Sequence, residues 1–463
     1  MLHTDTICAI STAQGGAIGV IRVSGPEAID AASRIFTPMH GKPLHERPHY
    51  TLTFGKIHAA DGEVIDEVLV SLFRAPHSYT GEDSVEISCH GSTYILQQVM
   101  IRLLENGCRL AQSGEYTQRA FLNGKMDLSQ AEAVADLIAS TSAATHRLAM
   151  NQMRGGFSKE LSTLRDKLLH LTSLMELELD FSDHEELEFA DRSELSQIAS
   201  DIERTVSRLA HSFSVGNAIK NGVPVAIIGE TNVGKSTLLN ALVGEERAIV
   251  SDIHGTTRDV IEDTVNLRGI TFRFIDTAGI RQTTDVVESI GIERTYQKMN
   301  QASIVLWMID ASLSSKANSE FKIQHSEFIN GKLLLLFNKA DRITPEEREA
   351  LLQSYAHVDA PKLFISAKEH LGLDALESHL VEAAALPDIS QSDVIVTNAR
   401  HYEALIHALD SIHRVQDGLQ MQLSGDLVSQ DLRECIHHLS DIVGEVSTDS
   451  VLQNIFKHFC IGK

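Results

Sequence analysis

The 463-residue sequence predicts a multidomain α/β protein with three parts: an N-terminal α/β domain, a discontinuous helical domain and a second α/β domain inserted into it. Two patterns carry this prediction. Short apolar runs typical of strands occur up to about residue 120 and again between 223 and 386. Apolar residues at helical spacing dominate 128–214 and return after 398. The predicted domain limits are 1–124, 125–219, 220–386 and 387–463.

The N-terminal segment has the pattern of a mixed α/β domain. Asp61-Gly62 separates two alternating runs and predicts a hairpin turn between paired strands. Gly15, Gly16 and Gly19 precede a strand instead of following it, which disfavours a dinucleotide-binding loop. The predicted elements are strands at 18–23, 49–58, 63–73 and 85–89 and helices at 27–35 and 93–104.

Residues 128–214 have the pattern of long helices, with Leu164 and Leu168 among the apolar residues of one face. The acidic run 180–191 predicts a solvated bend between two of these helices, and 217–222 predicts a polar hinge.

The C-terminal segment begins after a turn at Pro387 and is again helical, with helices predicted at 398–423, 427–442 and 447–459. This segment, with about 75 residues, is thin for an independent core. We therefore expect it to pack against the helices of 128–214, which makes the domain between them an insertion.

One short motif stands at the start of the inserted domain. The apolar run 223–228 leads into GETNVGKS, residues 229–236, and apolar residues at helical spacing follow. Strand, glycine loop and helix are the context of a G-x-x-x-x-G-K-[ST] phosphate loop. In that interpretation Lys235 spans the β- and γ-phosphates and the Ser236 hydroxyl binds Mg²⁺. The alternative is a chance glycine turn before an ordinary helix.

Two motifs that are expected to act on Mg²⁺ and the γ-phosphate follow in the order typical of GTPases. Residues 255–259, Gly-Thr-Thr-Arg-Asp, lie where a switch threonine would cover Mg²⁺. A strand at 270–275 ends in Asp276, which is placed to hold Mg²⁺ through water. The backbone N–H of Gly279 is expected to meet the γ-phosphate.

Two further motifs predict a site for the base. A strand at 333–337 ends in Asn338-Lys339-Ala340-Asp341, and the Asp341 carboxylate can accept both N–H groups of the guanine edge. Adenine lacks that donor pair and would leave the carboxylate unpaired, so the site selects GTP. Residues 366–368 are expected to reach guanine O6 with their backbone. Together the five motifs predict a Ras-like P-loop G domain, a GTPase.

The predicted GTP-binding residues are Asn232, Val233, Gly234, Lys235, Ser236, Thr237, Ser251, Asp252, Ile253, His254, Gly255, Thr256, Thr257, Asp276, Thr277, Ala278, Gly279, Asn338, Lys339, Ala340, Asp341, Ser366, Ala367 and Lys368.

The catalytic group of this domain is less obvious. Ile280 stands where small regulatory GTPases place a water-orienting glutamine, and it cannot take that role. Glu288 is the candidate, with a solvated charge at a helix start as the alternative. No arginine is clearly placed as a finger, and a monovalent cation held by Asn232 and backbone oxygens of 251–256 could replace it. The alternative for Asn232 is a loop residue that stabilises its own turn.

The bulk composition limits the remaining functions. With 40 basic and 63 acidic residues the net charge is −23, so the chain does not grip nucleic acid by phosphate neutralisation alone. Five scattered cysteines without a C-x-x-C pair indicate a reducing compartment. Neither a signal-peptide pattern nor a run long enough to span a membrane occurs, so we expect a cytoplasmic protein. Cys460 is either a small buried hydrophobe or, beside Lys457 and Lys463, an activated nucleophile.

The chain resembles the MnmE (TrmE) family of tRNA uridine-5-carboxymethylaminomethyl modification GTPases from end to end. The stretches that carry the resemblance, besides the G-domain motifs, are GVIRVSG at 19–25, YTGED at 79–83, RAFLNGK at 119–125, DLSQAEA at 127–133 and FCIGK at 459–463.

The resemblance implies an N-terminal domain that dimerises and binds a 5-formyl or methylene derivative of tetrahydrofolate. It also implies a heterotetramer with a flavin-dependent MnmG-type partner, which modifies C5 of the wobble uridine of certain tRNAs. Family roles transfer residue by residue. The positions are Arg22, Glu86, Lys125 and Lys463 for folate, Ser236 and Thr257 for Mg²⁺, Asn232, Ser251, Ile253 and Thr256 for K⁺, Glu288 for the attacking water and Cys460 for the modification chemistry.

One position departs from the family, since residue 251 is serine where relatives often have threonine. That position uses its backbone oxygen, so we expect little effect. The rival hypothesis is a regulatory GTPase switch in ribosome assembly without modification chemistry. The N-terminal domain and the Cys460 tail favour the modification enzyme, because a pure switch needs neither.

Overall fold

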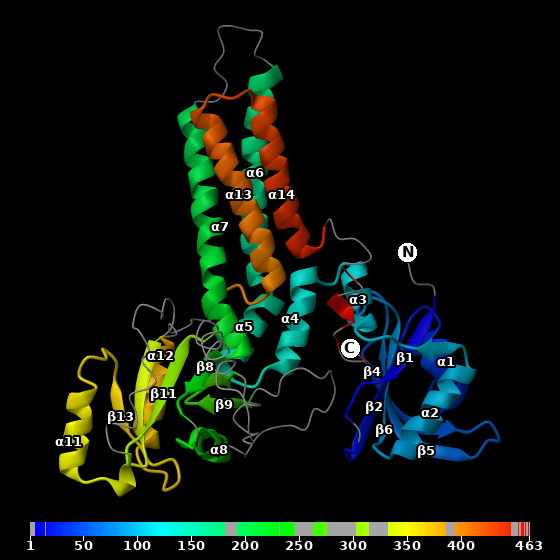
Figure 1. Ribbon diagram of the computed structural model, residues 1–463. Helices are drawn as coiled ribbons and strands as arrows, with labels where there is room; N and C mark the ends of the chain where they lie inside the picture. The colour runs from blue at the N-terminus through cyan, green and yellow to red at the C-terminus, as the bar shows by residue number, and fades with distance from the viewer. Residues whose placement is uncertain are drawn as a thin grey trace, which may run out of the picture. The chain divides into compact units, whose positions relative to one another are not determined.

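The computed structural model describes residues 5–13, 15–180, 192–230, 232–245, 263–275, 302–313, 332–385, 394–445, 452, 455–457, 459 and 462 (Figure 1). The chain divides into two compact units. The first comprises 1–139, 149–208 and 403–463, and the second comprises 140–148 and 209–402. Among the helices that the structure describes, none combines the length and apolar character needed to cross a membrane.

A seven-stranded sheet forms the N-terminal part of the first unit, in the order β3-β4-β5-β6-β2-β1-β7. Neighbouring strands are antiparallel except β1 and β7. The strands are β1 Thr6–Ile10, β2 Ile18–Ser24, β3 Phe36–Pro38, β4 Thr51–His58, β5 Val64–Phe73, β6 Ser84–His90 and β7 Cys108–Leu110.

Helices cover both faces of this sheet, and the two faces differ in chemistry. Helices α1 (Ala28–Ile35) and α2 (Thr93–Glu105) bury the apolar face with the inward residues of the strands. Helix α3 (Glu115–Leu122) lies against the other face, where Tyr116 packs on Ile7. A 3₁₀ turn, η1 (Leu44–Glu46), adds Leu44 to the apolar core.

Four long helices form a bundle whose members come from two distant parts of the chain (Figure 1). Helix α14 packs along α6, and the Arg433–Glu176 ion pair joins the same two helices. Arg208 pairs with Glu160 between α7 and α6, and Arg414 pairs with Asp431 between α13 and α14. The discontinuous helical domain predicted from the sequence is thus confirmed. Its helices are α4 Leu128–Ala139, α5 Ala143–Met153, α6 Gly156–Asp180, α7 Arg192–Asn221, α13 Ala399–Gln420 and α14 Gly425–Val443.

The second unit contains a six-stranded sheet in the order β13-β12-β11-β8-β10-β9. All neighbours are parallel except β9 and β10. Helices α8 and α12 pack on one face and α11 packs on the other. The elements are β8 Val223–Ile228, α8 Lys235–Glu245, β9 Asp263–Leu267, β10 Ile270–Phe274, β11 Ile304–Asp310, β12 Lys332–Asn338, η4 Ala340–Arg342, α11 Pro345–Ser354, β13 Lys362–Phe364 and α12 Leu373–Ala384.

The predicted hinge at 217–222 is wrong, because α7 continues to Asn221. Polar residues at 217 and 220–221 suit an exposed or half-exposed helix face as well as a loop, and neither proline nor a turn signal interrupts them. The helix ends only at Gly222, whose φ of +83° is left-handed. The predicted bend lies outside the described residues from 181 on, as does most of the helix predicted at 447–459.

Candidate functional site

The glycine loop predicted to bind phosphate lies between β8 and α8 at the carboxyl edge of the second sheet. Gly229 has a φ of +145°, and a Cβ there would lie 2.3 Å from the Met308 carbonyl oxygen. Gly234 has a φ of +103°, and its Cβ would lie 2.3 Å from Asn338 Nδ2. Neither position therefore has room for a side chain. The loop backbone can approach β11 and β12 closely because both residues are glycine.

Lys235 folds back over this loop. Its Nζ donates to the carbonyl oxygens of Gly229 and Glu230, each at 2.7 Å. The ammonium group is thereby held at the N-terminal end of α8, where the helix dipole also favours an anion. This arrangement can bind phosphate groups, which would replace carbonyl oxygens as acceptors.

Asn338 links the glycine loop to the end of β13. Its side chain is 3% exposed, and Nδ2 donates to the Val233 carbonyl oxygen at 2.8 Å. Oδ1 accepts from the Ala367 N–H at 3.0 Å. The phosphate loop and the 366–368 loop are thus fixed to one buried amide. A nucleotide site needs such a link, because one ligand contacts both loops with its phosphates and its base.

The residues after Asn338 are also ordered by local contacts. Lys339 has a left-handed φ of +63°, and its Nζ lies 2.5 Å from Asp310 Oδ2. Burial raises the pKa of Asp310, but hydrogen bonds from Lys339 and Ser312 outweigh it and hold the pKa below its ordinary value. A hydrogen bond with the Ser366 side chain lowers the pKa of Asp341, so the predicted base-reading carboxyl is kept ionised.

Several predicted site residues lie outside the described residues. They are Ser251, Asp252, Ile253, His254, Gly255, Thr256, Thr257, Asp276, Thr277, Ala278, Gly279, Glu288, Cys460 and Lys463.

A second cluster lies in the N-terminal sheet, around Arg22 and Glu86. These two residues are directly opposite each other on β2 and β6. Arg22 Nε donates to Glu86 Oε1 at 2.9 Å, and both side chains are partly exposed. The rings of Tyr79 and Tyr116 flank the guanidinium group, with their centroids 5.5 and 5.6 Å from its central carbon. A charged pair between two aromatic rings can bind a flat polar heterocycle by stacking and paired hydrogen bonds.

Lys125 is joined to the loop that carries Tyr79. Its Nζ donates to the Pro76 carbonyl oxygen at 2.9 Å. Gly81 has a φ of +79°, and a Cβ there would lie 3.3 Å from Lys125 Cδ, so the lysine stem lies against the loop backbone. The loop thereby connects Lys125 with the Arg22–Glu86 pair.

The tail of the chain reaches the same sheet within the first unit. Ser11 Oγ donates to the Gly462 carbonyl oxygen at 3.2 Å. A Cβ on Gly462 would lie 2.7 Å from the Ile10 carbonyl oxygen, so only glycine fits at the end of β1. The residue before the predicted folate ligand Lys463 is thus anchored to the N-terminal domain.

Comparison with known proteins covers the chain from end to end. The model described as GTP-binding protein TrmE N-terminus matches residues 6–125, and the MnmE helical domain model matches 128–460. The protein named tRNA modification GTPase MnmE from Phocaeicola vulgatus is 65% identical over 498 residues, covering 100% of both chains. The chain belongs to the MnmE family. Its MnmE relative from Bacteroides thetaiotaomicron is 68% identical over 470 residues, again covering 100% of both chains.

A solved structure of the G domain of the FeoB iron transporter from Thermotoga maritima is 26% identical to part of this MnmE-family chain. It covers 35% of this chain and 98% of its own, with a TM-score of 0.25. Family membership therefore rests on the end-to-end relatives and the two family models, which confirm the resemblance expected from the motifs.

The MnmE-family motif YTGED gave no individual roles at the sequence level, although the structure shows that it builds the Arg22 cluster. Tyr79 supplies the outer ring, and Glu82 reaches Arg119 on α3. The sequence does mark YTGED as a candidate functional loop, because it is a run of turn and polar residues between two predicted strands. The contact of this motif with α3 joins Glu82 to Arg119, which lie 37 positions apart in the sequence. A local sequence pattern cannot predict such a contact.

Proposed function

We propose that this protein is the GTPase of a tRNA-modifying complex. The complex adds a carboxymethylaminomethyl group to C5 of the wobble uridine of certain tRNAs, using a tetrahydrofolate one-carbon unit. GTP hydrolysis drives a conformational change through potassium-dependent dimerisation of G domains. The four segments 1–124, 125–219, 220–386 and 387–463 are the proposed domains.

The link made by Asn338 is the observation that carries the GTPase part. One buried amide ties the glycine loop to the 366–368 loop, with 2.8 and 3.0 Å hydrogen bonds. The phosphate-binding and base-binding segments are therefore held in fixed register by the protein's own hydrogen bonds. Such preorganisation lowers the cost of ordering the site on binding.

The donor groups of the loop fit the proposed ions. The Ser236 hydroxyl, in the first turn of α8, and Thr257 would hold Mg²⁺, which neutralises phosphate charge. Asn232 has a left-handed φ of +61° and an amide oxygen, and with Ser251, Ile253 and Thr256 it would hold K⁺. Glu288 would orient the attacking water. The position of the motif at 255–259 and the backbone oxygens of 251–256 support the remaining ion ligands, and the family resemblance selects the individual residues among them.

The Arg22 cluster fits a 5-formyl or methylene tetrahydrofolate. The Glu86 carboxylate can accept from an aminopyrimidine ring, and Tyr79, which is 37% exposed, offers a flat face for stacking. Lys125 and Lys463 would bind the carrier's anionic part. When bound, the carrier supplies the one-carbon unit, and Cys460 is the proposed nucleophile toward the uridine.

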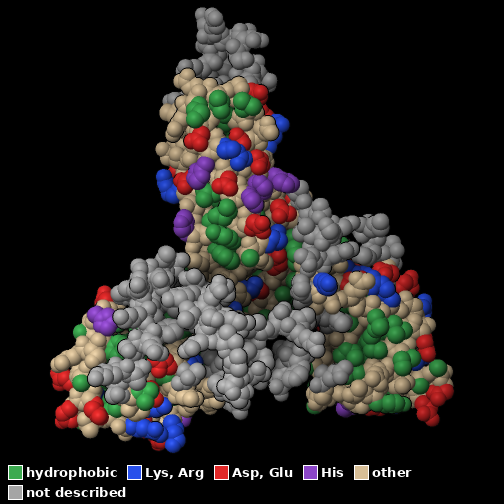
Figure 2. Space-filling model, viewed as in Figure 1, with side chains coloured by type: hydrophobic (Ala, Val, Ile, Leu, Met, Phe, Trp, Pro, Cys, Tyr) green, Lys and Arg blue, Asp and Glu red, His purple; other side chains and the backbone are tan. Residues whose placement is uncertain are grey.

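A partner resolves the charge problem of an acidic protein that acts on RNA. On the face seen in Figure 2, acidic and basic side chains are interspersed along the helical bundle and form no continuous basic stripe. With a net charge of −23, the chain gains little from phosphate neutralisation. We propose a cytoplasmic homodimer that joins a flavin-dependent MnmG-type partner, which supplies most of the contact with tRNA.

The test is nucleoside mass spectrometry on tRNA from cells that lack the protein. Wild type should restore the modified wobble uridine, whereas Lys235→Ala should not, because the loop loses its phosphate-binding ammonium group. Lys332→Ala, on an exposed lysine at the start of β12, serves as the charge-matched control and should restore it. Unmodified tRNA after rescue with wild type would contradict the proposal.

The rival function, a ribosome-assembly switch, is tested separately. Full-length protein should bind 5-formyl-tetrahydrofolate in isothermal titration calorimetry, and Arg22→Ala should abolish the binding heat. A chain that binds GTP but shows no folate binding favours the switch. Equal hydrolysis rates in sodium and potassium salts would count against the potassium site at Asn232.

A further inference from the structure

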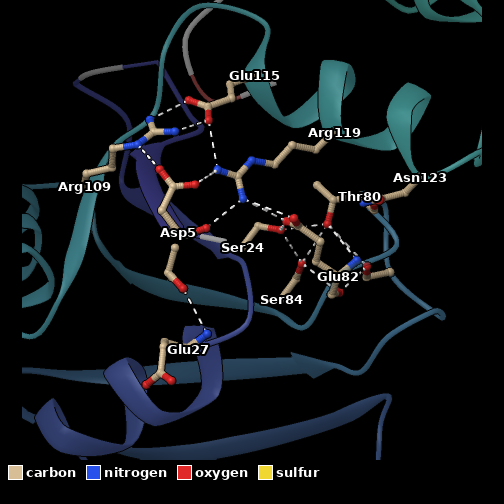
Figure 3. A network of polar contacts seen from close by, with 12 residues as sticks. Asp5, Ser24, Glu27, Thr80, Glu82, Ser84, Arg109, Glu115, Arg119 and Asn123 are labelled. Carbon is tan, nitrogen blue, oxygen red and sulfur yellow. Dashed lines mark hydrogen bonds and ion pairs between the residues drawn. The ribbon is translucent and has the colours of Figure 1, made fainter. Parts of the chain in front are cut away.

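An ion network that the proposed chemistry does not use joins α3 to Asp5 and to the loop that carries Tyr79 (Figure 3). Its centre is Arg119 on α3, whose side chain is only 1% exposed. Arg119 Nη2 lies 2.7 Å from Asp5 Oδ1 and 3.0 Å from Glu115 Oε1. Arg119 Nη1 lies 3.1 Å from Glu82 Oε1. Three carboxylates from three separate segments thus converge on one guanidinium group.

Two of these carboxylates hold the arginine in place. Glu115 is one helical turn from Arg119 on α3 and also binds Arg109, with Arg109 Nη2 to Glu115 Oε1 at 2.5 Å. Asp5 contacts both arginines. Burial raises the pKa of Glu115, but hydrogen bonds from Arg109, the Gln112 N–H and Arg119 outweigh it and leave the carboxyl ionised. The guanidinium group is therefore fixed without help from the loop.

The third carboxylate belongs to the loop that carries Tyr79. Glu82 also accepts from Ser24 Oγ at 2.9 Å, and Ser24 Oγ lies 2.7 Å from Thr80 Oγ1. Ser24 is two residues from Arg22 on β2, so both side chains are on the sheet face covered by α3. Glu82 is thus the connection between the fixed arginine, the strand with Arg22 and the loop.

The same loop contacts α3 near its start and the residue that follows its end. Asn123 Nδ2 donates to the Thr80 carbonyl oxygen at 2.8 Å, and the Tyr79 hydroxyl lies 2.9 Å from Thr117 Oγ1. Residues 78–83 are therefore held by Arg119 through Glu82, and by Thr117 and Asn123. These contacts set the position of the Tyr79 ring over Arg22.

The geometry points to Arg119 as a positioning residue for the proposed one-carbon site, acting through Glu82 on loop 78–83. Burying the Arg119 guanidinium group is costly unless its carboxylate partners are in place. The inference rests on the proposed function for the ligand's identity. Arg119 itself reaches neither the ligand nor the reacting atoms. Its role is to hold the loop that carries Tyr79 and contacts Lys125 in register with the Arg22–Glu86 pair.

The test compares two isosteric variants of full-length protein. Glu82→Gln removes the loop's charge on Arg119, while Asp5→Asn removes a different charge on the same arginine, away from the loop. Hydrogen exchange of residues 78–83 and the Kd for 5-formyl-tetrahydrofolate are measured for both, together with thermal stability. We expect Glu82→Gln to speed exchange and weaken binding at least about tenfold. Asp5→Asn should lower thermal stability but change the exchange of 78–83 and the Kd by less than about threefold, because Glu115 and the Asp5 backbone carbonyl oxygen still hold Arg119.

Equal effects of the two variants, or unchanged exchange in Glu82→Gln, would overturn the inference, because the network would then serve stability alone. Ser24→Ala, which removes only one hydroxyl, gives the same contrast if Glu82→Gln does not fold, with an expected effect of about threefold. A wild type that fails to bind the probe contradicts the proposed folate site. The exchange measurement still decides the role of Arg119 in that case.

Discussion

At the scale of single residues, Asn338 shows how one side chain can join two loops. Its amide nitrogen donates to the Val233 carbonyl oxygen, and its amide oxygen accepts from the Ala367 N–H. No shorter or charged side chain offers both groups at this reach. The buried position makes the loss of either bond costly, since the partner atom is left without water.

Asn338→Ala should therefore weaken GTP binding. Loss of two hydrogen bonds at a buried site corresponds to about 1–3 kcal/mol, or roughly fivefold to 150-fold in Kd. Fluorescent GTP-analogue titration measures the change. Asn221→Ala, at the exposed end of α7, is the matched control and should leave the Kd unchanged. An Asn338→Ala variant with wild-type affinity would show that the two loops do not need this link.

The Arg119 network predicts a response to acid. The pKa values of Asp5 and Glu115 are lowered by their arginine partners, against burial that raises them. A carboxyl with a folded pKa below its unfolded value contributes stability above the unfolded pKa and loses it as pH falls through the folded pKa. The N-terminal domain should thus lose stability as pH falls below about 4.5, the ordinary value for Glu115.

Urea denaturation between pH 3 and 7 tests this response. Glu115→Gln should be less stable at pH 7 and should show a flatter dependence on pH than wild type, because one of the linked protons is gone. Glu63→Gln removes a carboxyl from an exposed position and should follow the wild-type curve. The same slope in Glu115→Gln and wild type would contradict the assignment.

At the scale of elements, close backbone approach decides where glycine is required. Gly216 lies inside α7, where a Cβ would be 2.0 Å from the Val396 carbonyl oxygen. Gly244 lies near the end of α8, and a Cβ there meets nothing within 4 Å. The two helical glycines therefore serve different purposes, although a helix favours alanine over glycine at either position by about 1 kcal/mol at most.

Opposite outcomes are expected for alanine at these two positions. Gly216→Ala should destabilise the second unit by about 1–3 kcal/mol, because α7 or the 394–398 segment must move. Gly244→Ala should be neutral or stabilising by up to about 1 kcal/mol. Chemical denaturation followed by far-ultraviolet circular dichroism compares them. A Gly216→Ala variant as stable as wild type would mean that the contact with Val396 is easily relieved.

Elements with a regular apolar period were predictable, and those with polar buried faces were not. Strands such as β5 alternate cleanly and were found from sequence. Helix α3 was missed because Glu115, Thr117 and Arg119 are on its buried side, so its apolar period is lost. Strand β7 has only three residues, Cys108–Leu110, which is too short to give a pattern.

The candidate sites also differ in how far the sequence alone could predict them. The phosphate loop is local in sequence, and its glycines and Lys235 could be recognised from spacing alone. The Arg22–Glu86 pair depends on strand register and entered only through the family resemblance. The Asn338 link joins residues 105 positions apart in one of its bonds, so a tertiary contact had to be seen to find it.

At the scale of the whole molecule, two compact units carry two different proposed ligands. The proposed nucleotide site lies in the unit built from 140–148 and 209–402, and the proposed site for the one-carbon carrier lies in the unit with the N-terminal sheet. Each unit has its own cores. A ligand that binds only the folded state stabilises the unit that holds its site. Thermal unfolding in a calorimeter should therefore resolve two transitions with different ligand responses.

GDP at about a hundredfold excess over its Kd stabilises its unit by about 2.7 kcal/mol, which raises one transition by roughly 5–10 °C. 5-Formyl-tetrahydrofolate should raise the other transition and leave the first in place. Lys235→Ala should cancel only the GDP response, and Arg22→Ala only the folate response. If the chain instead shows a single transition that either ligand raises, the units unfold as one, and a ligand bound at one site stabilises the whole chain. That outcome would contradict the independent stability of the two units. Nucleotide binding at the phosphate loop would then stabilise the N-terminal sheet as well, without GTP hydrolysis.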